Sequence, residues 1–460
     1  MPPRVWAALT AGKLAAQLSR AFRIGGGTVV PGRVARWLAP DLLRRLARGL
    51  PHGAVVVTGT NGKTTTARLV ASALRAAGLR VVHNRAGANL PAGLVSTLVL
   101  AADGGGQLRA DVGVFEVDEA TFPRVAGELK PRLVVLTNLF RDQLDRYAEV
   151  DRVAVGWRQA LQTLGGDAVV CFNADDPQVA DVARDAPRSV AFGIEDVEAG
   201  RETLEDAADV RYCYRCGVPY RYRVVFLSHV GHYTCPACGT GRPRPAVRAE
   251  AVRVAGTSGF TAELAWDGER VAVLSELPGL YNVYNVLAAA AAAHALGIPP
   301  QALLRAVQAT KPAFGRGERL WWRGVLLQIL LVKNPAGFNE VLRALRAEPV
   351  RSLWIAIHDR TADGRDVSWL WDVDFETVRE SKAWVTVTGL RAEDLAVRLK
   401  YAGWAEDRIA VHRDLLRALE HAVAHTPAGG TLYCLPTYTA MLELRALLAR
   451  QGVAVAFWED

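Results

Sequence analysis

Residues 55–66 read VVVTGTNGKTTT, an apolar run followed by a glycine turn, a lysine and three hydroxyl side chains. This order predicts a strand, a loop whose backbone N–H groups surround an anion, and the N-terminus of a helix. Lys63 would place a positive charge on the phosphates, and the Thr64 hydroxyl could reach a magnesium ion. The general P-loop pattern has a glycine where Val57 stands, so the match is to a shorter and narrower pattern. The residues of the predicted nucleoside triphosphate site are Gly59, Thr60, Asn61, Gly62, Lys63, Thr64 and Thr65.

Four of the six cysteines form two Cys-x-x-Cys pairs separated by 18 residues, and each pair is followed by glycine. Two such pairs predict a tetrahedral zinc site that helps to fold a segment too small for its own core. Because protein ligands fill all four positions, the zinc would be structural. Disulfides are the alternative, and a cytosolic chain disfavours them. His229 and His232 lie between the pairs and are expected in a hairpin. The candidate ligands are Cys213, Cys216, Cys235 and Cys238.

Acidic and amide side chains follow three successive apolar runs. They lie in residues 115–119 (FEVDE), 137–145 (TNLFRDQLD) and 173–177 (NADDP). A single acidic turn after a strand commonly caps a helix. Three of them, at the sheet edge that carries the glycine loop, favour oxygen ligands for Mg²⁺ beside the phosphates.

The elements that would position these residues alternate between short apolar runs and helical stretches over residues 54–200. This alternation predicts an α/β fold with a parallel sheet, helices on both faces and ligands beyond the carboxyl ends of the strands. Residues 201–245, rich in Tyr, Arg and Cys, interrupt the pattern. Residues 312–319 are the predicted linker to a second α/β alternation. Before residue 54, two helices are expected around a break at residues 25–27, the second ending near Leu50.

We therefore predict a nucleotide-binding domain over residues 1–314, with the zinc ribbon inserted at about residues 209–243, and a Rossmann-like α/β domain over residues 315–460. The net charge of +8 suits anionic substrates or a membrane surface, and no lysine or arginine run indicates a nucleic-acid-binding arm. No signal peptide or transmembrane segment is expected. These features predict a cytoplasmic protein, with the inner face of the membrane as a candidate place of work.

The nucleotide loop, Glu116, the two later acidic segments and residues 277–285 (LPGLYNVYN) together resemble the ATPase domain of Mur ligases and folylpolyglutamate synthases. That family uses ATP to form amide bonds through an acyl phosphate. The resemblance implies that Lys63 braces the β- and γ-phosphates and that Thr64 and Glu116 hold Mg²⁺. Asn282 and Asn285 would lie near the nucleotide, with Asp175 as a weaker candidate.

The resemblance is sharper to the MurT family, the ligase-like subunits of lipid II isoglutaminyl synthases. It rests on the inserted ribbon and on the segments FRDQLD (140–145), KNPAGFN (333–339), ADGRDVSW (362–369) and LPTYTA (435–440). Classical Mur ligases have histidine at the position of Gln143, and a glutamine there fits the MurT family. Residues 358–360 read His-Asp-Arg, where MurT proteins usually have asparagines flanking an aspartate, which leaves the hydrogen bonding there open.

This resemblance implies an ATP-dependent carbon–nitrogen ligase that amidates the α-carboxylate of D-glutamate in the lipid II stem peptide, a step of peptidoglycan biosynthesis. Ammonia would come from a separate GatD-type glutaminase in a heterodimer. Asp366 would orient the catalytic histidine of that partner, with Asp363 as the fallback. A solvated turn that caps the helix after Val367 is the alternative for this segment.

Neither Cys171 nor Cys434 has the glycine-flanked turn of a glutaminase nucleophile, so the chain is expected to lack its own glutaminase. A stand-alone Mur- or folylpolyglutamate-type amino-acid ligase is the second interpretation. A nucleic-acid-binding NTPase that reads through the ribbon is the third. Trp354, Trp369 and Trp371 fit either core packing or a partner interface.

Overall fold

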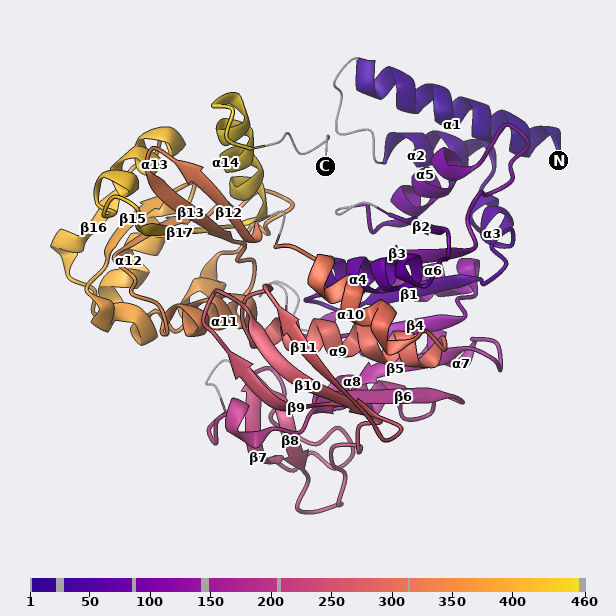
Figure 1. Cartoon of the computed structure of the whole chain (residues 1–460), viewed down its shortest axis with the longest axis horizontal. Coiled ribbons are helices and arrows are strands. Elements are labelled where there is room, and N and C mark those ends of the chain that lie inside the picture. The colour runs from indigo at the N-terminus through magenta and orange to yellow at the C-terminus, as the bar shows by residue number, and fades with distance from the viewer. Residues whose placement is uncertain are drawn as a thin grey trace.

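The computed structural model describes residues 2–21, 29–84, 88–141, 149–204, 208–312 and 315–454. Within them, two large sheets lie in different parts of the molecule, and a two-stranded hairpin belongs to neither (Figure 1). The described residues contain no helix with both the length and the apolarity needed to cross a bilayer.

Three helices precede the first strand: α1 (Pro3–Ala21), α2 (Val30–Leu38) and α3 (Leu42–Ala47). The single second helix predicted up to Leu50 is wrong, because the chain leaves helical geometry between α2 and α3, where Pro40 lacks an N–H for helix propagation. Helix α2 packs between α1 and α5 (Pro91–Ala101). The predicted break at residues 25–27 lies outside the described residues.

The first sheet has the order β11-β10-β9-β6-β5-β4-β1-β3-β2 and is parallel from β2 to β9. Strand β1 is buried along its whole length, as expected of a parallel strand covered on both faces. This confirms the predicted parallel α/β sheet. The strand bounds are β1 Ala54–Thr58, β2 Val81–His83, β3 Val112–Glu116, β4 Leu133–Leu136, β5 Val169–Asn173, β6 Ser189–Ile194, β9 Val247–Val254, β10 Phe260–Trp266 and β11 Glu269–Ser275.

Helices cover both faces of this sheet, and each face has its own apolar core. Helices α4, α9 and α10 lie on one face, with the Ala-rich α9 buried on almost every side. Helices α5 to α8 lie on the other. Their bounds are α4 Lys63–Ala76, α6 Phe122–Leu129, α7 Glu149–Gln162, α8 Pro177–Ala183, α9 Leu280–Ala295 and α10 Pro300–Ala309.

The cysteine-rich insert contains the hairpin of β7 (Arg221–Leu227) and β8 (Val230–Thr234), whose tight turn has Ser228 at φ 47°. His229 lies in the turn and His232 in β8, which confirms the hairpin predicted for both histidines. The hairpin contributes Phe226 and Val230 to the core beneath α9. It is therefore packed into the body of the molecule.

The second sheet has the order β12-β13-β17-β14-β15-β16, with β12 antiparallel and the other strands parallel. Helix α11 packs on one face, and α13 and α14 pack on the other. The element bounds are β12 Arg316–Trp322, β13 Val325–Leu330, α11 Pro335–Leu345, β14 Ser352–Ala356, β15 Trp384–Thr388, α12 Ala392–Tyr401, β16 Ile409–Val411, α13 Leu415–Ala424, β17 Thr431–Pro436 and α14 Tyr438–Arg450.

The linker predicted at residues 312–319 is wrong in its second half, because β12 begins at Arg316. The pairing with β13 shifts register between Arg316 and Glu318, and Gly317 has φ 92°, which glycine tolerates. A glycine-rich strand with such a bulge resembles a loop in sequence.

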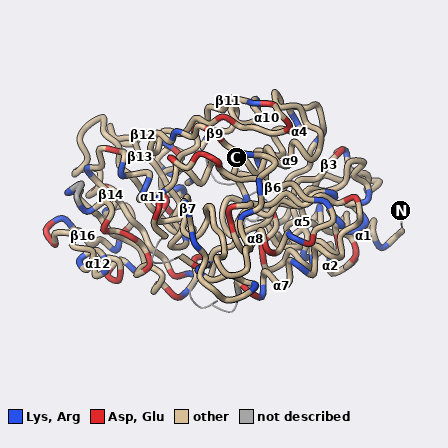
Figure 2. The backbone as a smooth tube through the Cα atoms, turned by 90° about the horizontal axis from the view of Figure 1, so that it is seen from below, with Lys and Arg blue, Asp and Glu red and all other residues tan. Residues whose placement is uncertain are grey.

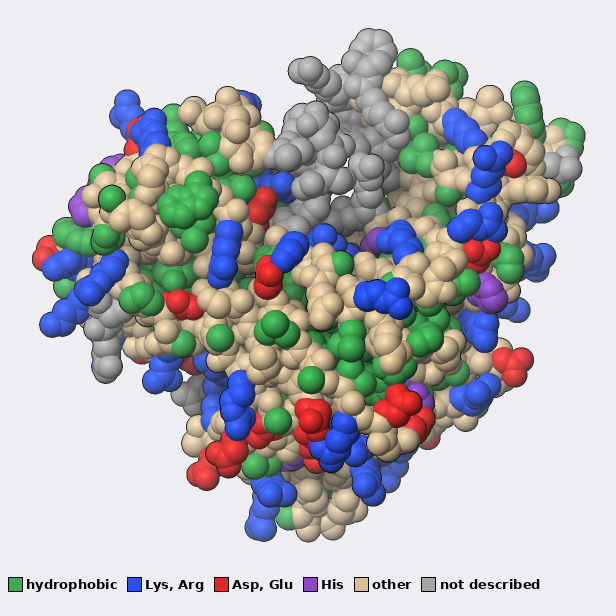
Figure 3. All heavy atoms as spheres, in the orientation of Figure 1, with side chains coloured by type: hydrophobic (Ala, Val, Ile, Leu, Met, Phe, Trp, Pro, Cys, Tyr) green, Lys and Arg blue, Asp and Glu red, His purple; other side chains and the backbone are tan. Residues whose placement is uncertain are grey.

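The second sheet lies at one end of the molecule and α1 at the other (Figures 1 and 2). Polar contacts join the two parts: Glu348 accepts from the Thr257 backbone N–H at 2.7 Å, and Arg343 donates to the Phe226 carbonyl at 2.6 Å. The face in Figure 3 mixes basic, acidic and apolar side chains over most of its area.

Candidate active site

The predicted nucleotide loop connects β1 to α4 and requires glycine at two positions. Gly59 and Gly62 have φ angles of 140° and 84°. A Cβ atom on Gly59 would lie 2.0 Å from Oγ1 of Thr137, and one on Gly62 would lie 2.1 Å from Oδ1 of Asn285. The positive φ angles and the neighbouring side chains thus leave no room for a Cβ atom at either position. Lys63 is the first residue of α4, directly after Gly62.

Lys63 is buried, and its ammonium group is held within its own loop. The Nζ atom donates to the carbonyl oxygens of Gly59 and Thr60 and forms an ion pair with Glu119 at 2.8 Å. An anionic ligand at the loop would offer oxygens in place of these acceptors. The arrangement keeps a buried cation compensated until such a ligand arrives.

Thr64 and Glu116 meet at the carboxyl end of β3. The Thr64 hydroxyl donates to Oε2 of Glu116 at 2.7 Å. Asn84 holds the Glu116 backbone at both its N–H and its carbonyl, and Asn89 lies 3.5 Å from Oε1. A hydroxyl and a carboxylate beside a phosphate loop form the all-oxygen donor set that Mg²⁺ prefers, so these residues fit that ion.

A network of amide side chains connects the loop to the second sheet. The Asn61 N–H donates to Oδ1 of Asn138 at 2.8 Å, and Nδ2 of Asn138 returns a bond to the Asn61 carbonyl at 3.1 Å. Nδ2 of Asn334 donates to Oδ1 of Asn61 at 3.1 Å. Asn334 also caps α11 by accepting from the Gly337 N–H at 2.8 Å. Residues far apart in sequence thus form one wall.

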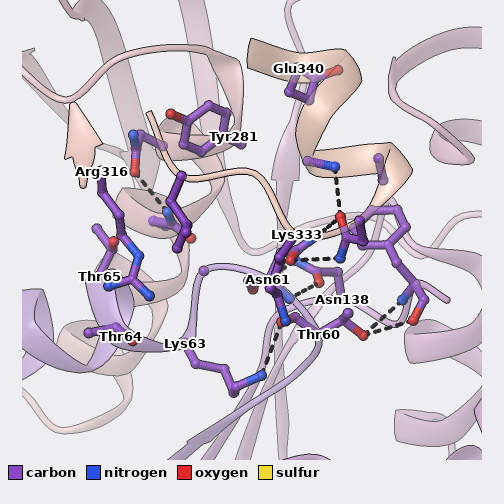
Figure 4. A pocket seen from close by; sticks show the side chains of 18 of the residues that line it. Thr60, Asn61, Lys63, Thr64, Thr65, Asn138, Tyr281, Arg316, Lys333 and Glu340 are labelled. Carbon is purple, nitrogen blue, oxygen red and sulfur yellow. Dashed lines mark hydrogen bonds between the residues drawn. The ribbon is translucent and has the colours of Figure 1, made fainter. Parts of the chain in front are cut away.

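A cavity of about 410 Å³ opens at this wall (Figure 4). All seven predicted loop residues except Gly59 line it, together with Glu116, Asn282 and Asn285. Cationic side chains come from both sides: Lys63 from the loop, Arg316 from β12 and Lys333 from the segment before α11. Burial lowers the pKa of Arg316, but a guanidinium stays charged at any physiological pH.

Asn282 and Asn285 lie on the first turns of α9, against the loop. Nδ2 of Asn285 donates to Oδ1 of Asn282 at 2.8 Å, and Asn282 donates to the Pro278 carbonyl at 2.7 Å. Oδ1 of Asn285 accepts from the Thr66 hydroxyl at 3.3 Å. The two asparagines thereby brace the start of α4 from inside the cavity.

The third acidic segment contributes Asn173 to the cavity, but its carboxylates face elsewhere. Asp175 accepts from the Tyr284 hydroxyl at 2.7 Å and pairs with Arg242. Asp176 caps α8 through the N–H groups of Gln178 and Val179. The helix-cap alternative thus applies to Asp176. Of the second segment, Asp142, Gln143 and Asp145 lie outside the described residues.

Several cavity residues were not singled out individually in the sequence interpretation: Asn138, Tyr281, Arg316, Asn334 and Tyr438. All of them except Arg316 lie in segments singled out for their family resemblance, which was an available signal. Arg316 lay in the presumed linker and gave none.

The four ribbon cysteines converge as predicted, with their sulfur atoms within 4.8 Å of one another. Sγ of Cys213 lies 3.6 Å from that of Cys238, and Sγ of Cys216 lies 3.4 Å from that of Cys235. A zinc tetrahedron with bonds of about 2.3 Å places its sulfurs about 3.8 Å apart. The cluster is therefore compatible with zinc.

Asp363 and Asp366 occupy different environments. Asp363 is buried and accepts from the Thr439 N–H at 2.8 Å and from the Thr439 hydroxyl, which ties it to the start of α14. Asp366 is half-exposed, and its Oδ1 accepts from the Ser368 N–H at 2.8 Å. Of the two, Asp366 presents the more accessible carboxylate.

His358 fills the position where the sequence departs from the family pattern. Its Nδ1 accepts from the Leu390 N–H at 3.1 Å, so Nε2 carries a proton toward Glu443 at 3.0 Å. Glu443 also pairs with Arg360 at 2.6 Å. In the His-Asp-Arg segment, His358 and Arg360 thus share Glu443 as a partner.

Core packing and a partner interface were the two interpretations of Trp354, Trp369 and Trp371, and the three tryptophans do not share one environment. Trp354 and Trp369 are buried in the second sheet's cores. Trp371 is 55% exposed and contacts Tyr401 edge to face, with ring centroids 5.6 Å apart. An exposed aromatic pair therefore includes a residue five positions after Asp366 in the sequence.

Comparisons with known proteins place this architecture in a class. The Mur ligase middle domain matches residues 57–215, and the MurT ligase C-terminal domain matches residues 331–441. A pseudomurein peptide ligase type C from Methanothermus fervidus superposes with a TM-score of 0.66 at 23% identity, covering 87% of this chain and 79% of its own. MurF from Thermotoga maritima, solved with ADP, superposes with a TM-score of 0.62 at 14% identity, covering 91% and 85%. The fold is that of a Mur ligase.

Two curated relatives narrow the assignment. Lipid II isoglutaminyl synthase (glutamine-hydrolyzing) subunit MurT from Staphylococcus aureus strain COL is 32% identical over 97% of this chain and 98% of its own length. The subunit of the same name from Streptococcus pneumoniae is 31% identical over 94% of each chain. The chain belongs to the MurT family.

Proposed function

We propose that this chain is the ligase subunit of a lipid II isoglutaminyl synthase, which converts the α-carboxylate of D-glutamate in the stem peptide to the amide of D-isoglutamine. Its relatives are named for that activity and match nearly the whole chain. The observation that carries the proposal is the shared cavity, in which the P-loop meets the MurT-type segment around Asn334. A nucleotide and a second substrate can meet there.

In this proposal the cavity residues divide between the nucleotide and its metal. Lys63 would exchange its loop carbonyls for phosphate oxygens, and Asn282 and Asn285 would border the nucleotide from α9. Thr64 and Glu116 would hold Mg²⁺, which when bound neutralises charge on the phosphates. Arg316 and Lys333 face the cavity from the other side and would attract a carboxylate substrate.

The chemistry requires activation because a carboxylate is a poor electrophile. A carboxylate oxygen attacks the γ-phosphorus of ATP, the bond to the β-phosphate oxygen breaks, and ADP leaves. Ammonia then attacks the carbonyl carbon, inorganic phosphate leaves with the carboxylate oxygen, and the nitrogen loses a proton. The cations of Lys63 and Arg316 oppose the negative charge of the phosphoryl group during the first step.

The ammonia would come from a separate glutaminase subunit of the GatD type. A glutaminase nucleophile must ionise, but burial strongly raises the pKa of both Cys171 and Cys434. In this proposal, the partner docks near the exposed pair of Trp371 and Tyr401. Asp366 would orient the partner's catalytic histidine.

Zinc would fill the four-cysteine cluster in a structural role. We also propose that residues 1–314 and 315–460 form the two domains, with the ribbon at residues 209–243. The chain would act in the cytoplasm, where ATP is available, at the inner face of the membrane.

Isotope transfer tests the proposed reaction directly. With ¹⁸O in the α-carboxylate of D-glutamate and ammonia as the nitrogen source, released phosphate should carry the label in step with amide formation. Unlabelled phosphate beside a formed amide would refute the acyl phosphate. Amide formation from glutamine by the isolated chain would refute the need for a separate glutaminase.

A further inference from the structure

The net charge of this chain is concentrated at its N-terminal end. The first 50 residues contain nine Lys or Arg and a single acidic residue, Asp41. They therefore carry a net charge of +8, equal to that of the whole chain, and the other 410 residues balance at 46 of each sign. A localised charge of this kind attracts a polyanionic surface.

Helix α1 combines this charge with an unusual outer face. Its inner side packs Val5, Leu9 and Ala16 against the protein. The exposed side chains on the opposite side include Trp6, Leu14 and Leu18, which are about half exposed. No charged residue from Trp6 to Leu18 is exposed, because Lys13 is partly buried and donates to the Ala102 carbonyl. A solvent-facing helix surface is normally polar, so this face suits an apolar environment.

Helix α2 adds an aromatic side chain among arginines. Trp37 is 81% exposed and lies in a shallow depression with Arg33, Arg36 and Arg124. The Arg4 side chain donates to the Leu38 carbonyl, which places the start of α1 beside the end of α2. Apolar and basic side chains lie together over α1 and its neighbouring helices in Figure 3.

Some of these arginines are already neutralised and others are not. Glu128 pairs with both Arg36 and Arg124 at 3.2 Å. Arg33 and Arg48 are exposed, and neither has a carboxylate partner among the described residues. Guanidinium groups bind phosphate oxygens in a bidentate manner, and tryptophan favours the boundary between headgroups and hydrocarbon.

We propose that Trp6, Leu14, Leu18, Arg33, Trp37 and Arg48, here called the N-terminal surface, dock this protein on an anionic phospholipid bilayer. The apolar side chains would enter the headgroup boundary while the arginines contact lipid phosphates. Charge complementarity selects this occupant, since a second copy of the chain would bring together two surfaces of the same sign. The proposal stands apart from the chemistry of the cavity.

Flotation of the full chain with vesicles tests the proposal. The wild type should float with vesicles of equal parts phosphatidylcholine and phosphatidylglycerol, less so as salt is raised, and weakly with phosphatidylcholine alone. Trp37→Ser should weaken binding about tenfold, whereas Trp321→Ser, which changes a tryptophan on β12 that is 61% exposed, should not.

A second pair of variants separates charge from apolar contact. Arg33→Gln with Arg48→Gln should weaken anionic binding about tenfold. Arg351→Gln with Arg417→Gln is the control, because it removes the same charge from two exposed arginines in the part of the chain that forms the second sheet. This control variant should bind the vesicles as the wild type does. All four proteins should keep the wild-type melting temperature and the same turnover of a water-soluble stem peptide.

Equal flotation of the N-terminal and control variants would overturn the proposal. A wild type that does not float with anionic vesicles would also overturn it. If light scattering of that protein shows self-association that Trp37→Ser abolishes, a second copy of the chain would cover the N-terminal surface instead. Because flotation needs no turnover, its outcome does not depend on the proposed amidation.

Discussion

Lys63 is the residue on which the proposed chemistry depends most directly. Its ammonium is buried and compensated by Glu119 and by carbonyls of its own loop. We predict that Lys63→Ala lowers the kcat of ATP-dependent amidation by about 100- to 1,000-fold, because it removes a cation facing the transferred phosphoryl group. Phosphate release measures turnover, and Lys400→Ala, which removes an exposed lysine, is the control. The variant should still bind the glutaminase in size-exclusion chromatography, and lost association would make the loop structural.

Asp366 and Asp363 separate an intersubunit role from a structural one. Asp366 is half-exposed and bonds to the Ser368 N–H, so Asp366→Asn should leave this chain folded. We predict that it lowers glutamine-dependent amidation by at least about 100-fold while amidation from free ammonia stays within about twofold, because an Asp–His contact is needed only for glutamine hydrolysis. Equal loss with both nitrogen sources would rule out this role.

Asp363→Asn provides the contrasting variant. Its carboxylate holds the N–H and the hydroxyl of Thr439 at the start of α14. An asparagine can still accept from the Thr439 N–H and can donate to the Thr439 hydroxyl, but both buried bonds lose the strengthening that a charged acceptor gives. The cost should be about 1–3 kcal/mol of unfolding free energy, with both nitrogen sources affected alike.

At the scale of elements, the zinc ribbon is coupled to the cavity through its hairpin. Leu227 and Val230, on either side of the turn, line the cavity, while the four cysteines lie beyond the other end of the strands. Metal binding in such small segments supplies much of their folding free energy. The ribbon should therefore affect the site as well as stability.

We predict that Cys235→Ser with Cys238→Ser abolishes zinc binding, lowers the melting temperature by several degrees and raises the KM for substrate. Metal analysis, calorimetry and steady-state kinetics measure these effects. Asp267→Asn, a change in an exposed turn of the first sheet, is the control. Unchanged stability in a zinc-free double variant would show that the ribbon folds without metal.

Local sequence patterns were sufficient for most elements of the fold. The apolar runs before Gly59 and Val117 are β1 and β3, because a strand buried on both faces must be continuously apolar. The cysteine pairs likewise identified the ribbon, since ligand spacing is a local property. Strand β12 was missed because its glycine and charged residues resemble a linker and only its pairing with β13 makes it a strand.

The site was predictable only on the side built by the first sheet and the start of α9. The loop, Thr64 and Glu116 lie on adjacent strands whose order follows from parallel α/β topology. Arg316 and Asn334 reach the same cavity from another sheet, and no local pattern encodes how two sheets meet. For the same reason the sequence did not show that Asp175 faces away from the cavity. Its partners Arg242 and Tyr284 are distant from it in sequence.

At the scale of the whole molecule, the nucleotide site is also a joint between two sheets. The amide pair of Asn61 and Asn334 closes it on one side, and Thr257 bonds to Glu348 and Gln328 elsewhere along the same junction. A ligand that fills the cavity touches residues of both sheets. Binding should therefore restrict their relative motion.

We predict that ATP with Mg²⁺ slows hydrogen exchange in α11 as well as in α4, and raises the unfolding free energy by about 2.7 kcal/mol at a nucleotide concentration 100 times Kd. Asn334→Ala removes the α11 cap and the bond to Asn61, so nucleotide should still protect α4 but protect α11 much less. Asn339→Ala is the matched control, since it changes an asparagine of the same helix that bonds instead to Asp374. Protection of α4 alone in the wild type would show that nucleotide binding does not join the sheets, and the second substrate would then have to close the site.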